Sequence, residues 1–269
     1  MNSILFKMEL RRNARSLFLW SFIISALIFF TMSLFRSVLE YHQQIIGMVK
    51  IVPIAAMKAR GFGNISDIFS GLGFYAANNT VYMMLLGSVY SMVLCSNILL
   101  KEEYGKTAEF LMSRPVSRNE IFLSKMAVAF LNIILLNLIS GLISLVSLGI
   151  FKSGDFRFQP FLVLAMYTFL LNVFFGAFGV MVAALMKRAR PVTAFCVGLV
   201  LVFYFLFTIS RIPGVNGGFG YISPFKWVNV DVLNPSYGLE FWRIALFLGL
   251  TALLVFLSGA IYRKKDILT

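Results

Sequence analysis

Six long runs of residues without a single Asp, Glu, Lys, Arg or His constrain this chain more than any other feature. A helix rises about 1.5 Å per residue, so about 20 apolar residues cross the roughly 30 Å hydrocarbon core of a bilayer. In lipid, a helix satisfies its own backbone hydrogen bonds. We therefore predict an all-α integral membrane protein with six transmembrane helices, over residues 17–34, 81–100, 126–150, 161–186, 191–210 and 244–262.

The composition supports this class. Of the 269 residues, 59% are hydrophobic and 13% are charged, against about 25% charged in soluble domains. A net charge of +13 would suggest nucleic acid in a soluble chain. Beside membrane spans, basic residues instead face anionic lipid, so we expect membrane lipid and no nucleic acid as a partner. The apolar setting of Cys95 and Cys196, and the lone His42, predict no metal site and no catalytic site.

The distribution of Lys and Arg orients the predicted spans. One set of connecting segments carries 15 basic residues in 52 positions, and the other carries nine in 89. The richer set is predicted to be cytoplasmic, which places both termini inside the cell. It consists of residues 1–16, 101–125, 187–190 and 263–269, and the extracellular set consists of 35–80, 151–160 and 211–243.

Three of these segments have structure of their own. Residues 1–16 alternate apolar and basic side chains at helical spacing, which predicts a short amphipathic interfacial helix, or else an ordinary basic flank. Residues 35–80 begin with a helical spacing and are expected to break at glycines, including Gly71. Residues 211–243 combine glycine and proline with aromatic rings, which predicts a partly re-entrant cap or an interfacial aromatic loop.

The segment 101–125 holds nine charges in 25 residues. Thr107 can cap a short helix that Pro115 stops, and Ser117 with Glu120 matches a capping box that starts a second helix leading into the third span. Phe110 and Leu111 would be exposed on the short helix. They form a docking surface for a soluble partner, or they pack back onto the protein's own helices.

The predicted spans lack the ionisable groups that an ion-coupled transporter uses, and this restricts the possible energy source for transport. An ion-coupled carrier needs ionisable or ion-coordinating groups at membrane depth, and no predicted span contains a charged residue. The polar residues Asn132, Asn137 and Asn172 are more often contacts between helices than ligands. Gly105-Lys106-Thr107 lacks the earlier glycine and the strand of a phosphate-binding loop. If the protein transports, its energy is therefore expected to come from another chain.

The charged segment resembles a known family. Glu102-Glu103-x-x-Gly105-Lys106-Thr107-x-Glu109, followed by Ser113-Arg114-Pro115-Val116-Ser117-Arg118, is similar to the transmembrane (permease) subunits of type-2 ABC exporters, which share the ABCG-like, or type V, fold. Ser223-Pro224-Phe225 before the last span and the two cytoplasmic ends agree with it. The similarity extends over nearly the whole chain, so residues 1–269 are expected to form one transmembrane domain of the bacterial plasma membrane.

The resemblance implies a partner and a site. Residues 107–115 would be a coupling helix seated on a separate ATP-binding subunit, two of which would serve two permease copies, in a homodimer. ATP and Mg would bind to that partner, with no cofactor on this chain. Glu102 and Glu103 would relay the movement. The implied docking residues are Thr107, Glu109, Phe110, Leu111, Ser113, Arg114 and Pro115.

The second and fifth spans would line the cargo path by the same resemblance. Their charge-free faces suit an amphipathic or hydrophobic cargo, with bacterial peptides such as phenol-soluble modulins as the leading expectation. An antibiotic, lantibiotic or lipid self-protection permease and a non-transporting scaffold are the alternatives, and ordinary packing is the alternative for each aromatic residue. The expected path residues are Ser88, Ser91, Cys95, Phe195, Phe203 and Phe207.

Overall fold

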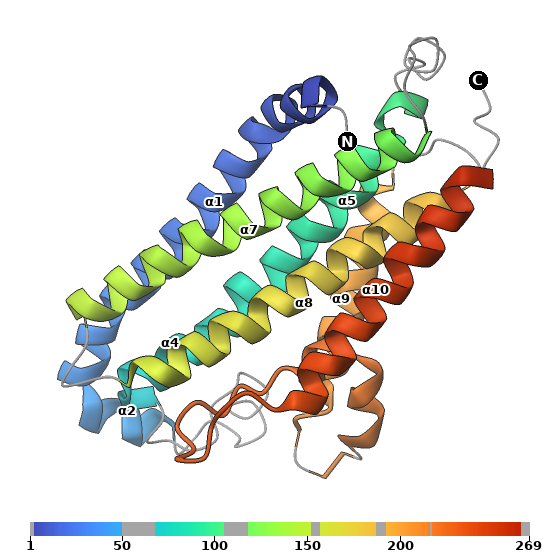
Figure 1. Ribbon diagram of the computed structural model, residues 1–269. Coiled ribbons are helices and arrows are strands. Elements are labelled where there is room, and N and C mark those ends of the chain that lie inside the picture. The colour runs from blue at the N-terminus through green and yellow to red at the C-terminus, as the bar shows by residue number, and fades with distance from the viewer. Residues whose placement is uncertain are drawn as a thin grey trace.

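In the computed structural model, helices are the only regular secondary structure within the part of the chain that it describes, and the long helices run alongside one another (Figure 1). The long helices are α1 (Ser3–Glu40), α5 (Gly87–Tyr104), α7 (Arg118–Phe151), α8 (Phe158–Leu185), α9 (Thr193–Ile209) and α10 (Phe241–Lys264). The shorter helices are α2 (His42–Val49) and α4 (Gly71–Asn79). The described residues are 3–49, 68–104, 118–151, 157–186, 192–212, 214–215 and 217–264.

Five helical stretches are long and apolar enough to cross a membrane: Ile4–Glu40, Gly71–Lys101, Asn119–Phe151, Phe158–Leu185 and Phe241–Arg263. They account for five of the six predicted spans. The remaining one coincides with α9, which has 17 residues and a length of about 25 Å. Because α9 is shorter than the other long helices, the predicted span over residues 191–210 stays a prediction.

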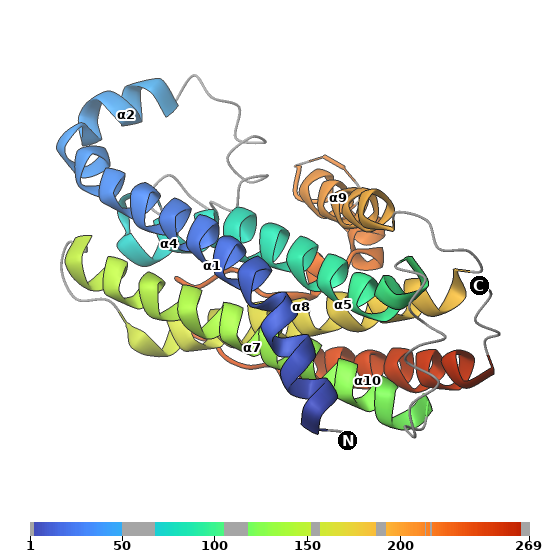
Figure 2. The same cartoon turned by 90° about the horizontal axis from the view of Figure 1, so that it is seen from above.

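The first helix differs from the sequence prediction. Residues 1–16 were expected to hold a separate interfacial helix, but the structure continues one helix from Ser3 to Glu40. No glycine or proline lies between these two residues, so nothing in the local sequence interrupts the backbone hydrogen bonds. The N-terminal turns bend away from the rest of α1 (Figures 1 and 2).

The second span begins earlier than predicted, because Gly71 starts helix α4 instead of breaking the chain. A π-helical segment, Thr80–Leu86, joins α4 to α5, so the helical run extends over 31 residues from Gly71 to Lys101. The Tyr82 hydroxyl oxygen of this segment lies 2.8 Å from the Thr31 hydroxyl oxygen of α1. The helical spacing expected after residue 40 corresponds to α2, and residues 50–67 lie outside the described part.

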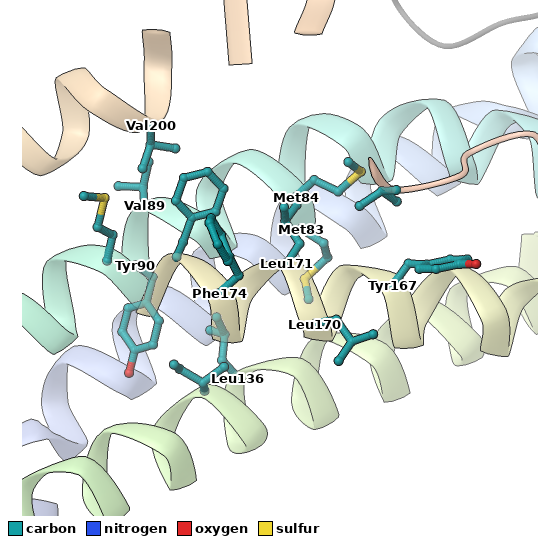
Figure 3. Packing of buried hydrophobic residues seen from close by; sticks show 14 of the residues in the cluster. Met83, Met84, Val89, Tyr90, Leu136, Tyr167, Leu170, Leu171, Phe174 and Val200 are labelled. Carbon is teal, nitrogen blue, oxygen red and sulfur yellow. The ribbon is translucent and has the colours of Figure 1, made fainter. Parts of the chain in front are cut away.

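Helix α8 lies at the centre of the bundle, with α5 along one side and α10 along another, while α1 packs along α7 (Figures 1 and 2). Small residues let α5 and α8 approach closely. A side chain at Gly179 would overlap the Met92 carbonyl oxygen. Around this contact, α5 residues such as Val89 and Tyr90 lie beside Phe174 of α8 and Leu136 of α7 (Figure 3).

Polar side chains join the helices inside this apolar core. The Asn172 amide nitrogen of α8 donates to the Asn137 side-chain oxygen of α7 at 3.1 Å. The Ser88 hydroxyl of α5 donates to the Asn172 oxygen at 3.3 Å. Asn172 thus links three helices, which confirms that this residue and Asn137 serve as contacts between helices. The Asn132 amide nitrogen, by contrast, donates within its own helix, to the Val128 carbonyl at 2.8 Å.

Replacing Asn172 by Leu should lower the free energy of unfolding by about 1 kcal/mol, the scale measured for hydrogen bonds between membrane helices. The change removes both inter-helix bonds. Denaturant unfolding in detergent micelles measures it. Asn132→Leu is the matched control, because the Asn132 Oδ1 atom is buried without a partner among the described residues and its loss should cost little. Equal destabilisation by the two variants would contradict the conclusion that Asn172 stabilises the contact between the helices.

Candidate functional site

A polar cluster lies where α1 begins and α5 ends. The Glu9 side chain on α1 is fully buried, and its Oε2 atom lies 3.0 Å from the Lys101 ammonium nitrogen of α5. The Asn13 amide nitrogen donates to the Glu9 carbonyl at 2.8 Å and lies 3.5 Å from Oε2. A buried carboxylate is tolerated when it is paired and hydrogen-bonded, so this ion pair fixes the start of α1 against the end of α5.

The start of α7 is held at the same end of α5. Lys125 is 1% exposed, and its ammonium nitrogen donates to the Ile98 carbonyl of α5 at 2.7 Å. A cation near the last turns of a helix also complements the partial negative charge of the helix C-terminus. We call Glu9, Asn13, Lys101 and Lys125 the polar junction; it ties α1, α5 and α7 together.

The polar junction lies at the base of the predicted docking loop. Helix α5 ends at Tyr104, three residues after Lys101, and α7 begins at Arg118 on the other side of the loop. Helix α7 continues unbroken to Phe151, which confirms that the helix after the loop leads into the third span. Because both helices flanking the loop are fixed by junction contacts, a displacement of the loop would reach α1, α5 and α7 together.

The predicted docking residues themselves cannot be placed. Thr107 to Pro115 fall within residues 105–117, which lie outside the described part of the chain. Glu102 and Glu103 belong to the last turn of α5, but their side chains are also outside it. Their roles therefore stay predictions.

Glu9 was missed by the sequence prediction, which treated residues 1–16 as an apolar face opposite a basic face. The structure buries Leu5 and Glu9, four residues apart on one side of α1, and leaves Ile4 and Met8 exposed. The available signal was that Glu9 is the single acid among four basic residues in this segment.

The path residues expected on the second span face the protein interior. Ser88, Ser91 and Cys95 are all buried. The Ser88 hydroxyl bonds to Asn172 of α8, and a side chain at Gly176 of α8 would contact the Cys95 sulfur at 3.1 Å. The structure thus places these three residues on the side of α5 that packs against α8.

The expected residues of α9 divide between two faces. Phe203 and Phe207 point inward, toward Phe175 of α8 and Phe225 respectively, with ring centroids 6.2 Å apart in both pairs. Phe195 is 57% exposed. It begins an exposed stripe at heptad spacing, a pattern that lies along one helix face. The stripe, called here the α9 stripe, is Phe195, Gly198, Val202, Phe205 and Ile209.

The loop between α9 and α10 folds against the bundle. Its two 3-10 helices are Gly217–Ile222 and Pro224–Trp227. The Ser223 hydroxyl donates to the Phe203 carbonyl of α9 at 2.6 Å. Phe225 is fully buried, with its ring centroid 5.2 Å from that of Phe175. The loop therefore packs against the middle of α8 and of α9, and we call residues 211–240 the cap.

These contacts agree with the order of helices expected for a transporter subunit, and a family comparison decides the class. A family model described as "ABC-2 family transporter protein" matches residues 3–267. The chain belongs to the ABC-2 transporter family. A comparison with curated proteins finds no match.

Membership of the ABC-2 family shows where ATP is hydrolysed in the transporter. Its membrane subunits lack a catalytic ATPase domain and pair with ATP-binding subunits. The prediction that this chain is not an enzyme is confirmed on that ground. The structure contains no group of three or more His, Cys, Asp or Glu able to hold a metal within the residues that it describes. The chain is thus a multi-pass membrane component of an ABC-2 transporter.

Proposed function

We propose that this chain is the permease subunit of an ATP-driven exporter, and that its ATP-binding subunit docks on residues 101–125. The observation that carries the proposal is the polar junction at the base of this loop. Glu9 pairs with Lys101 at 3.0 Å, and Lys125 bonds to the Ile98 carbonyl at 2.7 Å. Force applied to the loop would be shared among three helices at once, as a two-state transport cycle requires.

The proposed cycle uses two ATP-binding subunits and two permease copies. When the ATP-binding subunits close, the loop moves, and α5 and α7 shift relative to their partners. The start of α1, the end of α10 and the two helix ends that flank the loop lie at one end of the bundle (Figure 1). We propose that this end is the cytoplasmic side of a bacterial plasma membrane. The Lys and Arg excess of the segments at that end supports this orientation.

We propose that cargo moves along the α9 stripe, opposite a second permease copy. The structure supports this revision of the expected path, because Phe195 and Phe205 are each 57% exposed whereas Ser88, Ser91 and Cys95 are buried. The stripe has no charged residue, so it suits an amphipathic or hydrophobic cargo. Peptides resembling phenol-soluble modulins are the first choice, and lipophilic antibiotics or lantibiotics are the second.

Glu109→Arg and Arg114→Glu should each lower cargo-stimulated ATP hydrolysis about tenfold, the effect of losing about 1.4 kcal/mol of docking free energy. Each change reverses a charge on the proposed coupling helix. The measurement is ATPase activity of the reconstituted complex with a peptide panel, together with co-purification of the ATP-binding subunit. Arg157→Glu, located before α8 at the opposite end of the bundle, is the control. Wild-type assembly and stimulation in both docking variants would refute the proposal.

A further inference from the structure

Three cationic residues, two in the cap and one at the start of α10, lie at the end of the bundle opposite the polar junction. They are Arg211, Lys226 and Arg243. The Arg243 Nη1 atom donates to the Trp227 carbonyl at 2.9 Å, and its Nε atom lies 2.9 Å from the Glu240 carboxylate. These contacts fix Arg243 against the short 3-10 helix that carries Lys226.

Arg211 lies two residues beyond Ile209, the last residue of α9. Its guanidinium carbon lies 5.3 Å from the centre of the Phe207 ring. Its Nη1 atom is buried and has no hydrogen-bond partner among the described residues. A buried donor without a partner is costly, so a ligand able to accept a hydrogen bond there would stabilise the cap.

Lys226 lies in the second 3-10 helix of the cap. Its Cδ atom lies 3.8 Å from where a side chain at Gly220 would begin, a position that would also overlap the Ser210 hydroxyl. The lysine stem therefore runs beside the end of α9. Burial, and then the positive charges of Arg211 and Arg243, lower the pKa of Lys226. Lys226 is thus near enough to both arginines for their charges to act on it.

The neighbouring acids leave this positive charge incompletely matched. Glu240 is already engaged by Arg243, by the Trp242 ring nitrogen at 2.9 Å and by the Asn229 amide at 3.1 Å. The charge of Asp231 acts on Arg211, yet the residue is exposed and forms no ion pair with it within the described structure. Arg211 and Lys226 therefore lack a direct anionic partner in that part of the chain.

Exposed aromatic and apolar side chains surround the cluster, including Tyr221, Ile222, Phe241 and Trp242. Such residues are typical of the membrane–water interface. Arginine and lysine together suit phosphate oxygens, which accept several charge-assisted hydrogen bonds. We propose that Arg211 and Lys226, with Arg243 behind them, form a site for a phosphate group, supplied by an anionic phospholipid headgroup or by soluble phosphate.

The test uses the purified full-length chain in lipid nanodiscs. Native mass spectrometry measures retention of phosphatidylglycerol against phosphatidylcholine, and thermal shift measures stabilisation by inorganic phosphate. Arg211→Gln and Lys226→Gln should each weaken binding about tenfold, the effect of losing one charge-assisted hydrogen bond. Arg157→Gln, an exposed arginine that precedes α8, should leave binding unchanged.

The outcomes distinguish a lipid headgroup from soluble phosphate, and both of these from the absence of a phosphate site. Preferential phosphatidylglycerol retention that both cap variants lose would identify a lipid headgroup, and phosphate stabilisation without lipid preference would identify a soluble ligand. If Arg211→Gln does not fold, Lys226→Gln decides alone, because its side chain is only partly buried. Binding of neither probe, or equal loss in Arg157→Gln, would overturn the proposal.

Discussion

Replacing Lys101 by Ala is expected to uncouple transport from ATP hydrolysis. The change leaves the fully buried Glu9 carboxylate without the cation that lies 3.0 Å from it. Leaving one member of a buried pair alone costs several kcal/mol. Because the Lys101 side chain is 24% exposed, water offsets part of that cost, and we expect a loss of about 2 kcal/mol in the free energy of unfolding. Transport per ATP hydrolysed should fall about tenfold.

The measurement pairs peptide uptake into inverted vesicles with phosphate release. The exchanged double variant, Glu9→Lys with Lys101→Glu, should restore part of both transport and stability, since the pair is re-formed with reversed polarity. Arg12→Ala is the control, because its guanidinium lies 4.0 Å from Glu9 and is 48% exposed. Undiminished coupling in Lys101→Ala would show that the polar junction does not transmit force.

Replacing Gly179 by Ala is expected to give the largest loss of stability. The added methyl group would overlap the backbone carbonyl of Met92 on α5. Backbone cannot move aside as a flexible side chain can, so α8 must shift from α5 along its length. Overpacking costs about 1–3 kcal/mol and sometimes more, and we expect a value near the upper end, about 3 kcal/mol.

Gly198→Ala on α9 is the matched control, because nothing lies within 4 Å of the added carbon. It should retain or slightly raise stability, since alanine favours a helix over glycine by about 1 kcal/mol. Thermal unfolding in detergent, followed by size-exclusion chromatography, compares the two variants. Similar unfolding temperatures for both would show that α5 and α8 are not held by this contact.

The long helices were predictable from the sequence, because absence of charge over about 20 residues is a strong requirement of lipid. The predicted fourth span, 161–186, differs from α8 by three residues at its start and one at its end. The continuous helix from the docking loop into the third span was also predictable. Its first residues carry a cap pattern, and α7 then contains no proline.

The direction in which each helix faces could not be predicted in the same way. Helix α5 is apolar on nearly all sides, so its sequence contains no strong pattern that distinguishes the side against α8. Ser88 and Cys95 were assigned to the cargo path because they form a small, mildly polar face, and the structure buries that face against the small residues of α8. Gly71 was read as a break because glycine weakens a helix interior, but it stands at a helix start, where that cost is small.

The attachment of the cap to α9 has a consequence for inhibition. The Ser223 hydroxyl bonds to the α9 backbone, and Phe225 is buried against Phe207 of the same helix. Rotation of α9 would therefore move residues 217–227 together with the helix. We therefore expect a nanobody that binds this segment to immobilise α9 without entering the lipid.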